Sequence, residues 1–347
     1  MATQLKKTVK PSGGDYTSLE ACMNANEQNL VTADKYFDVE IDGTWSSPDS
    51  RCIIYNYTTD ATRYINVYTT SAARHNGIYS SSKYEITNTS ELEGAIKVKS
   101  NYVRISGIQA SQSTIGTTTY MLSCIGVADG GDYLLVSNCI CKLTSAGRIM
   151  AGITLGAGGG AINNIIYNTN TAAKTNIKGI SITTGESGAV LYNNTVYGCD
   201  VGISSSNQTI ANATNNICTT NAVDFSSNWG YTASADNIST DATSPNNEWD
   251  SITLANIKFV STTAGSEDFH LQVGSAAIDV GTDLSASFTD DIDGETRPTG
   301  ANTWDIGADE YIAVVPAAPS SDGAFGSGRF NRGRFGTNAF GKPRFKT

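Results

Sequence analysis

The chain has 347 residues, of which 39% are hydrophobic and only 16% charged, and its formal net charge is −10 at pH 7. A chain of this length can bury a large core, and its acidic balance argues against nucleic-acid binding by the folded body. Asn, Thr, Ser, Gly and Ile are abundant, as is typical of strands and turns, and segments rich in helix-forming residues are almost absent.

The first 35 residues are expected to form a strand followed by a capping helix. Residues 8–10 are typical of a strand, and GGDYTSLEACMNANEQN predicts a turn that leads into an amphipathic helix. Thr17 is the expected N-cap, and Glu20, three positions later, completes a capping box. No apolar run follows the lysines near the start, so we expect no secretory signal and no membrane anchor, and synthesis and folding in the cytoplasm.

A repeat follows, in which four segments open with Gly and then Ile or Val. These openings are Gly126-Val127, Gly152-Ile153, Gly179-Ile180 and Gly202-Ile203. Between them recur apolar stretches that carry asparagine, which are LLVSNCI, INNIIYN, LYNNTVYG and ATNNICTT. Unequal loops around a near-constant kernel predict stacked coils of short strands with Ile, Val, Leu and Cys inside. Side-chain amides in each coil are expected to bond those above and below, forming a ladder of Asn138, Asn164, Asn194 and Asn216.

These repeats resemble the right-handed parallel β-helix of the pectate-lyase-like superfamily, chiefly over residues 94–225. The resemblance implies an all-β fold, a right-handed parallel β-helix solenoid with an N-terminal capping helix and an extended C-terminal tail. The expected boundaries are 1–35 for the strand and capping helix, 36–285 for the β-helix, 286–311 for a closing segment and 312–347 for the tail. The stretch TDDIDGETRPTGANTWDIGADEY is similar to the closing segment of many β-helix proteins.

Metal and cofactor chemistry is expected to be absent. The seven cysteines show no paired metal-ligand spacing, and we predict that they are buried as small hydrophobic residues. Carboxylates in the closing segment admit a calcium site, but Arg297 lies among them, and ion pairing is the favoured interpretation. These carboxylates are Asp290, Asp291, Asp293, Asp305, Asp309 and Glu310.

One carboxylate pair is the candidate for catalysis. Enzymes of the resembled superfamily use clustered carboxylates, either with calcium and a basic residue or as two or three aspartates on adjacent coils. Asp200 and Asp224 are 24 residues apart, about one coil, and would suit a glycosidase pair. Each also follows an Asn-containing strand, where an exposed loop acid is ordinary, so the favoured interpretation assigns no catalytic residue. Arg148 and Lys174, 26 residues apart, would suit an acidic sugar on one face.

The tail carries phenylalanine at every fifth position. Residues 321–347 hold six Lys or Arg and one Asp, whereas residues 1–320 hold 17 basic and 32 acidic residues. Ordering five residues costs about 5–10 kcal/mol, and burying one Phe returns about 1.5–3 kcal/mol, so the tail is expected to be ordered only on a partner. The favoured partner is a protein, ahead of nucleic acid. The alternative is that the tail is a flexible linker that binds no partner. The expected contact residues are Phe325, Arg329, Phe330, Arg332, Arg334, Phe335, Phe340, Arg344 and Phe345.

β-Helix proteins similar in outline occur in tailed phages as tail spikes, fibres and head-surface proteins. The resemblance and the tail together imply a structural phage virion protein, a capsid decoration, fibre or tail-surface component involved in host attachment. It would be assembled in the host cytoplasm and bound to capsid or tail proteins through its tail, with a homotrimer and a host glycan as further candidate partners. The alternatives are a polysaccharide depolymerase, lyase or glycosidase, and a non-catalytic glycan-binding adhesin that uses Tyr167, Tyr192 and Tyr197.

Overall fold

The computed structural model describes residues 2–89, 94–115, 121–128, 130–146, 149–172, 174–183, 188–205, 212–226, 234–245, 249–300 and 303–313. The chain divides into two compact units, residues 1–311 and 312–347, and the described residues lie almost entirely in the first. The expected contact residues of the tail, Phe325 to Phe345, lie outside the described residues.

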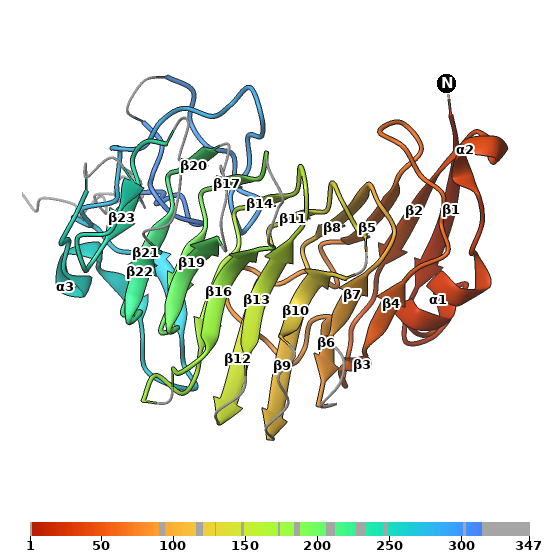
Figure 1. The fold of residues 1–347 in the computed structure, drawn as a ribbon, viewed down its shortest axis with the longest axis horizontal. Coiled ribbons are helices and arrows are strands. Elements are labelled where there is room, and N and C mark those ends of the chain that lie inside the picture. The colour runs from red at the N-terminus through yellow and green to blue at the C-terminus, as the bar shows by residue number, and fades with distance from the viewer. Residues whose placement is uncertain are drawn as a thin grey trace, which may run out of the picture. The chain divides into compact units, whose positions relative to one another are not determined.

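Three long parallel sheets form the first unit (Figure 1). Sheet 1 contains β1 Thr3–Val9, β2 Lys35–Ile41, β5 Ile65–Thr69, β8 Val103–Ser106, β11 Leu135–Ser137, β14 Gly160–Ile162, β17 Val190–Tyr192 and β20 Asn212–Thr214. Sheet 2 contains β3 Asp49–Ser50, β6 Glu85–Asn88, β9 Gln109–Ile115, β12 Ile140–Ala146, β15 Ile165–Asn168, β18 Thr195–Tyr197, β21 Ile217–Thr219 and β23 Ile238–Ser239. Sheet 3 contains β4 Cys52–Ile54, β7 Ile96–Val98, β10 Leu122–Val127, β13 Met150–Leu155, β16 Ile177–Ile182, β19 Val201–Ser205 and β22 Val223–Phe225.

From β2 to β22 the chain visits sheets 1, 2 and 3 in turn, and each strand pairs in parallel with its counterparts one coil before and after. The all-β parallel solenoid is therefore confirmed. Its sheets run from Thr3 to Ser239, so they begin before residue 36 and end before residue 285, the bounds expected for the β-helix. After Ser239 come helix α3, Leu254–Ile257, and an antiparallel hairpin of β24, Phe259–Ser261, and β25, Asp268–Leu271. Alternation of apolar residues indicates a strand but not the strand with which it pairs. The prediction therefore included this hairpin in the β-helix.

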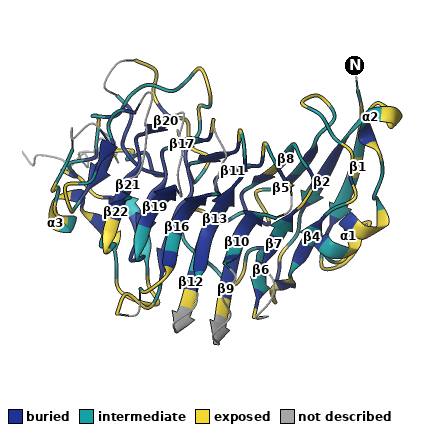
Figure 2. Cartoon of the chain, viewed as in Figure 1, coloured by how far each residue is buried: buried dark blue, intermediate teal, exposed yellow. Residues whose placement is uncertain are grey.

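The core lies between the three sheets, and Figure 2 shows buried residues continuing from coil to coil along the strands. All seven cysteines are free and buried, which confirms that prediction. The repeated Gly-Ile openings lie on sheet 3, where a side chain would have no room. A Cβ on Gly152 would lie 2.3 Å from Cγ2 of Ile166, and one on Gly179 would lie 2.2 Å from Cγ1 of Val196. Glycine thus permits close approach of sheet 3 to sheet 2.

Helix α1, Leu19–Ala25, packs against β1 and β4 with Leu19, Cys22 and Met23 buried. Its N-cap is Ser18, whose hydroxyl accepts a hydrogen bond from the backbone N–H of Ala21 at 3.2 Å. The expected cap at Thr17 is therefore wrong by one residue: the first helical residue is Leu19, and the N-cap is the extended residue directly before it. A second short helix, α2, spans Leu30–Ala33. No helix of the described residues is long and apolar enough to span a membrane.

The turn between sheets 1 and 2 carries a buried column of asparagines. Asn164 donates from Nδ2 to Oδ1 of Asn194 at 2.9 Å, Asn194 to Asn216 at 2.9 Å, and Asn216 to Asn237 at 2.8 Å. The same Oδ1 atoms also accept backbone N–H groups of the preceding coil, so each amide supports two coils. Asn237 was not among the residues expected in this ladder.

Asn138 belongs to a different column, which corrects its placement in the ladder. The position in register with the ladder is Cys139, whose backbone N–H donates to Oδ1 of Asn164 at 3.0 Å. Asn138 has a left-handed backbone with φ 52°, as do Asn163, Asn193 and Asn215 at φ 53°, 51° and 59°. Asn tolerates this conformation better than most residues. One residue of offset therefore turns Asn138 away from the core.

This outer column binds the segment that closes the unit. Asn138 donates to Oδ2 of Asp290 at 2.7 Å, and Asn163 donates to the carbonyl of the same residue at 2.7 Å. Asn193 donates to the carbonyls of Asp305 and Gly307 at 2.9 and 3.0 Å. Asp290, Asp305 and Gly307 of the closing segment thus lie along the outer side of the turn that holds the ladder.

Candidate functional site

Asp200 and Asp224 are not in register on neighbouring coils. Val201 pairs with Val223, which places Asp224 two positions further along its strand than Asp200. Asp224 is fully buried, and burial raises its pKa to about 6. Its Oδ1 accepts from Asn221 Nδ2 at 2.8 Å, and its Oδ2 accepts from the Thr240 N–H at 2.6 Å and the Thr240 hydroxyl at 2.7 Å. The carboxylate of Asp224 therefore fixes a loop.

The remaining candidates on that face also bond backbone groups. Asp200 accepts from the backbone N–H of Asn176 at 2.9 Å. Lys174 donates from Nζ to the carbonyl of Thr220. Arg148 lies outside the described residues. The described residues of this face thus connect neighbouring coils to one another.

Arg297 is the centre of the closing segment and is completely buried. Its Nη1 donates to Oε2 of Glu310 at 2.7 Å, and its Nη2 donates to the carbonyls of Gly307 and Ala308 at 3.0 Å each. Its guanidinium carbon lies 5.2 Å from the ring centroid of Trp304. Burial lowers the pKa of Arg297, and the surrounding carboxylates oppose that change. The favoured ion-pair interpretation of this segment agrees with this geometry.

The neighbouring carboxylates are directed at backbone N–H groups. Asp291 Oδ1 accepts from the N–H groups of Asp293 and Glu295 at 2.9 and 2.8 Å. Asp305 accepts from the N–H groups of Asp279 and Tyr311 at 2.8 and 2.6 Å. These carboxylates therefore hold backbone turns of the closing segment and of the loop that contains Asp279.

His270, Asp293 and Asp309 form a smaller cluster whose ligand atoms all lie within 4.8 Å of one another. His270 Nδ1 lies 2.5 Å from Asp268 Oδ1, and its Nε2 lies 2.9 Å from Asp293 Oδ2. Burial acts to lower the pKa of His270, but the hydrogen bond to Asp293 and the charges of Asp309 and Asp293 outweigh it and raise the pKa to about 10. With carboxylates on both ring nitrogens, the imidazole is held as a cation and balances the negative charge itself.

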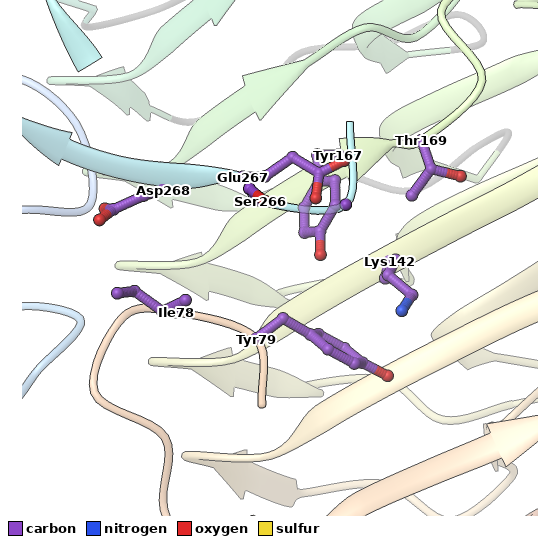
Figure 3. A pocket seen from close by; sticks show the side chains of 9 residues that line it. Ile78, Tyr79, Lys142, Tyr167, Thr169, Ser266, Glu267 and Asp268 are labelled. Carbon is purple, nitrogen blue, oxygen red and sulfur yellow. The ribbon is translucent and has the colours of Figure 1, made fainter. Parts of the chain in front are cut away.

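A cavity of about 380 Å³ is lined in part by Asp268 (Figure 3), the residue that contacts His270 Nδ1. Tyr79, Lys142 and Tyr167 meet there from a loop, β12 and β15, and Glu267 and Asp268 border it from the hairpin. The ammonium of Lys142 lies 4.1 Å from the Tyr79 ring centroid. Burial and the charges of Glu267 and Glu85 raise the pKa of Tyr167, so its hydroxyl stays protonated.

The three tyrosines expected to bind sugar are covered by other parts of the chain. Tyr167 and Tyr197 are buried, and their ring centroids lie 5.4 and 5.3 Å from that of Phe269 in the hairpin. Tyr192 is half-buried and stacks on Phe288 at 6.4 Å. The hairpin and closing segment thus use these rings for packing.

Sheet 1 displays a different set of tyrosines, which sequence reasoning missed. Strand register aligns Tyr36, Tyr64, Tyr102 and Tyr133 on four successive coils. The signal was present as YFDV, YINV, YVRI and YLLV, a tyrosine one residue ahead of a buried alternating pair. The tyrosines are separated by 28, 38 and 31 residues. This spacing is less regular than that of the Gly-Ile openings, so the repeat was not recognised in the sequence.

No family model, curated protein or solved structure matches this chain.

Proposed function

We propose that the chain is a structural protein of a phage virion, a rigid solenoid attached to capsid or tail proteins by its C-terminal residues. The observation that supports this most directly is the division of the chain. Residues 1–311 form one compact unit, and residues 312–347 form a second that contains the basic phenylalanine repeat. The two units also differ in the sign of their charge, as expected if they contact different partners.

The acid–base clusters of the first unit are compatible with a structural role. Arg297, Asp291 and Asp305 bind the closing segment to itself, and Asp224 binds a loop. Each of these groups therefore has a role in holding the fold. A depolymerase remains the alternative outcome, with Asp200 and Asp224 as the residues to test.

The finer description of the fold belongs to the same proposal. Parallel connections between neighbouring strands are almost always right-handed, which favours a right-handed β-helix like that of the pectate-lyase-like superfamily. Helix α1 buries Leu19, Cys22 and Met23 beside the first strands, as a helix that covers the end of the core would. A homotrimer is the proposed assembly, because it would place three tails on one attachment site.

Co-sedimentation tests the attachment. The full-length chain and a chain truncated after Pro319 are each mixed with capsids, tail-less particles and intact particles of the phage that carries it. Binding by the full-length chain alone is expected. Phe335→Ala and Phe340→Ala should each weaken it by about 1–3 kcal/mol, whereas Asn338→Ala, the matched control between them, should not. If neither chain sediments with any particle, the proposal is wrong. Release of reducing sugar from host capsule would favour the depolymerase instead.

A further inference from the structure

We infer that sheet 1 carries a binding site for a neutral, linear glycan in the furrow beside Tyr64, Tyr102 and Tyr133. This site does not rest on the virion proposal, because it concerns only described residues of the first unit. The tyrosine furrow, as we call it, is a cavity of about 290 Å³. Its wall is the three tyrosines, and its floor is Arg104, Leu135, Gly160 and Val190.

The wall is built by stacking along the solenoid. Tyr102 and Tyr133 lie with ring centroids 4.4 Å apart and planes 4° apart, and Tyr36 and Tyr64 lie 5.7 Å apart. Tyr133 is 47% exposed, unusual for a large ring in a packed stack. Because Tyr102 and Tyr133 cover each other's facing surfaces, a polymer that binds here meets ring edges on successive coils and the exposed part of Tyr133.

Two of these tyrosines hold a backbone conformation that aromatic residues rarely adopt. Tyr102 has φ 51° and Tyr133 has φ 58°. The register continues to Gly158 and Gly188, which have φ 60° and 82°. Glycine would occupy the left-handed position at lower cost on all four coils. Bulky residues in such positions point to function, since the chain accepts strain to present them.

Beyond Tyr133 the wall stops at Gly158. A Cβ on Gly158 would lie 2.5 Å from Cε1 of Tyr133. The ring therefore extends over this glycine, and any side chain there would displace it. A Cβ on Gly160 would similarly lie 2.9 Å from Cδ1 of Leu135. Gly158 thus leaves room for the ring of Tyr133, and Gly160 leaves room for the side chain of Leu135.

The floor fixes the direction of the ligand. Arg104, Leu135, Gly160 and Val190 are register partners on β8, β11, β14 and β17. The furrow therefore runs across the strands along the solenoid axis, with inter-strand steps of about 4.8 Å. That is the path of an extended chain of several sugar rings rather than of a compact molecule.

The chemistry of the furrow selects the ligand class. The guanidinium carbon of Arg104 lies 3.8 Å from the ring centroid of Tyr64, and among the described residues Arg104 has no carboxylate partner. Its N–H groups can donate to hydroxyl oxygens, while Leu135, Val190 and the exposed part of the Tyr133 ring can contact the C–H groups of sugar rings. Asp60 and Asp132 lie near Tyr102, and residues 1–320 carry 32 acidic against 17 basic residues. This charge repels polyanions, which favours a neutral glycan over an acidic glycan or a nucleic acid.

A glycan array with the purified full-length chain tests the inference, using immobilised linear neutral oligosaccharides of four or more sugars, acidic oligosaccharides and proline-rich peptides. We expect retention of at least one neutral glycan. Tyr133→Gly should weaken that binding about tenfold or more, because it removes the exposed ring. It also suits the left-handed backbone, so the variant should remain folded. Arg104→Gln should weaken binding as well, and Tyr55→Ala, a half-exposed tyrosine outside the furrow, is the matched control.

Three results would overturn the inference. The first is equal retention of neutral glycan by the wild-type chain and by Tyr133→Gly. The second is retention of acidic glycans only. The third is capture of proline-rich peptides, with no furrow variant changing the retention of glycan. Circular dichroism and the melting temperature of each variant establish that a loss of binding is not a loss of fold. None of these readouts uses a phage particle, so failure here is distinguishable from failure of the attachment proposal.

Discussion

Asn193 and Asn194 are neighbours in the chain, yet their side chains bind on opposite sides of the same turn. Asn193 donates outward to the carbonyls of Asp305 and Gly307 in the closing segment. Asn194 donates inward to Asn216 of the next coil. The Asn-Asn pairs in successive coils thus serve two purposes, since the first residue holds the closing segment and the second stacks the coils.

The inner ladder should contribute strongly to stability. Asn194→Ala removes the acceptor of the backbone N–H of Asn164, which is left buried and unpaired, and one of the two acceptors of Asn164 Nδ2. We expect a loss of about 2–4 kcal/mol in the free energy of unfolding, measured in urea. Asn66→Ala, which removes one half-buried bond to Asp38, is the control and should cost about 1 kcal/mol. Equal losses would contradict the ladder's special role.

Arg297 should be the most sensitive position of the closing segment. Arg297→Met removes the buried guanidinium that donates to Glu310 and to four backbone carbonyls, and it leaves the Glu310 carboxylate buried without its ion-pair partner. We expect a loss of about 3–5 kcal/mol in the free energy of unfolding. Arg63→Met is the matched control, because that arginine pairs with Asp34 and Asp60 at 2.9 Å on the surface, where a loss below about 1 kcal/mol is expected. If Arg297→Met lowered the free energy of unfolding no more than Arg63→Met, Arg297 would not be the most sensitive position of the closing segment.

His270 should make stability depend on pH above neutrality. Its folded pKa of about 10 lies above the ordinary 6.5, so the folded state retains a proton that the unfolded state releases. Its contribution is complete below pH 6.5 and is lost as pH rises towards 10. In the wild-type chain the free energy of unfolding therefore falls as pH rises through this range. In His270→Gln it should fall less steeply, by up to about 1 kcal/mol per pH unit.

The control for this prediction is His75→Gln. Burial and the charge of Arg74 lower the pKa of His75 to about 4, so it is neutral in both states above about pH 7.5. Its replacement should leave the slope between about pH 7.5 and 9 unchanged. Parallel curves for wild type and His270→Gln would show that Asp268, Asp293 and Asp309 do not hold the imidazole as a cation.

Gly158→Ala should disturb the tyrosine wall. The left-handed backbone costs about 1 kcal/mol for a non-glycine residue, and the clash with the Tyr133 ring adds to it. Gly13→Ala, at φ 74° with no atom within 4 Å of its Cβ, measures the backbone cost alone. The double variant Gly158→Ala/Tyr133→Gly should lose about 1 kcal/mol less in the free energy of unfolding, measured in urea, than the sum of the losses of the two single variants. Strict additivity would mean that the ring moves without cost.

The cysteines should be inert in the folded chain. All seven are buried, and burial raises the pKa of Cys22 and of Cys139 to about 12, which removes the reactive thiolate at neutral pH. A disulfide-exchange thiol reagent at pH 8 should label fewer than one thiol per chain before unfolding and seven in urea. Rapid labelling of the native protein would contradict the burial of these thiols.

The sequence by itself determined the all-β solenoid and the burial of its cysteines. The Gly-Ile openings and Asn-containing strands recur because every coil packs against its neighbours in the same way. The repeat is therefore visible in the sequence. Gly152 and Gly179 illustrate this, since each is required by the side chain of a neighbouring strand. The Asn164–Asn194–Asn216 column follows the same logic.

Only the tertiary structure decided which face each repeated residue occupies. A shift of one residue separates Asn138 from the ladder, and a shift of two separates Asp200 from Asp224, and no pattern of unequal loops fixes such offsets. The hairpin that buries Tyr167 and Tyr197 returns over the coils from more than 60 residues away in the chain. Register and the covering of one segment by another depend on contacts between segments that are distant in the chain. These contacts bury Tyr167 and Tyr197 and leave Tyr133 of sheet 1 exposed.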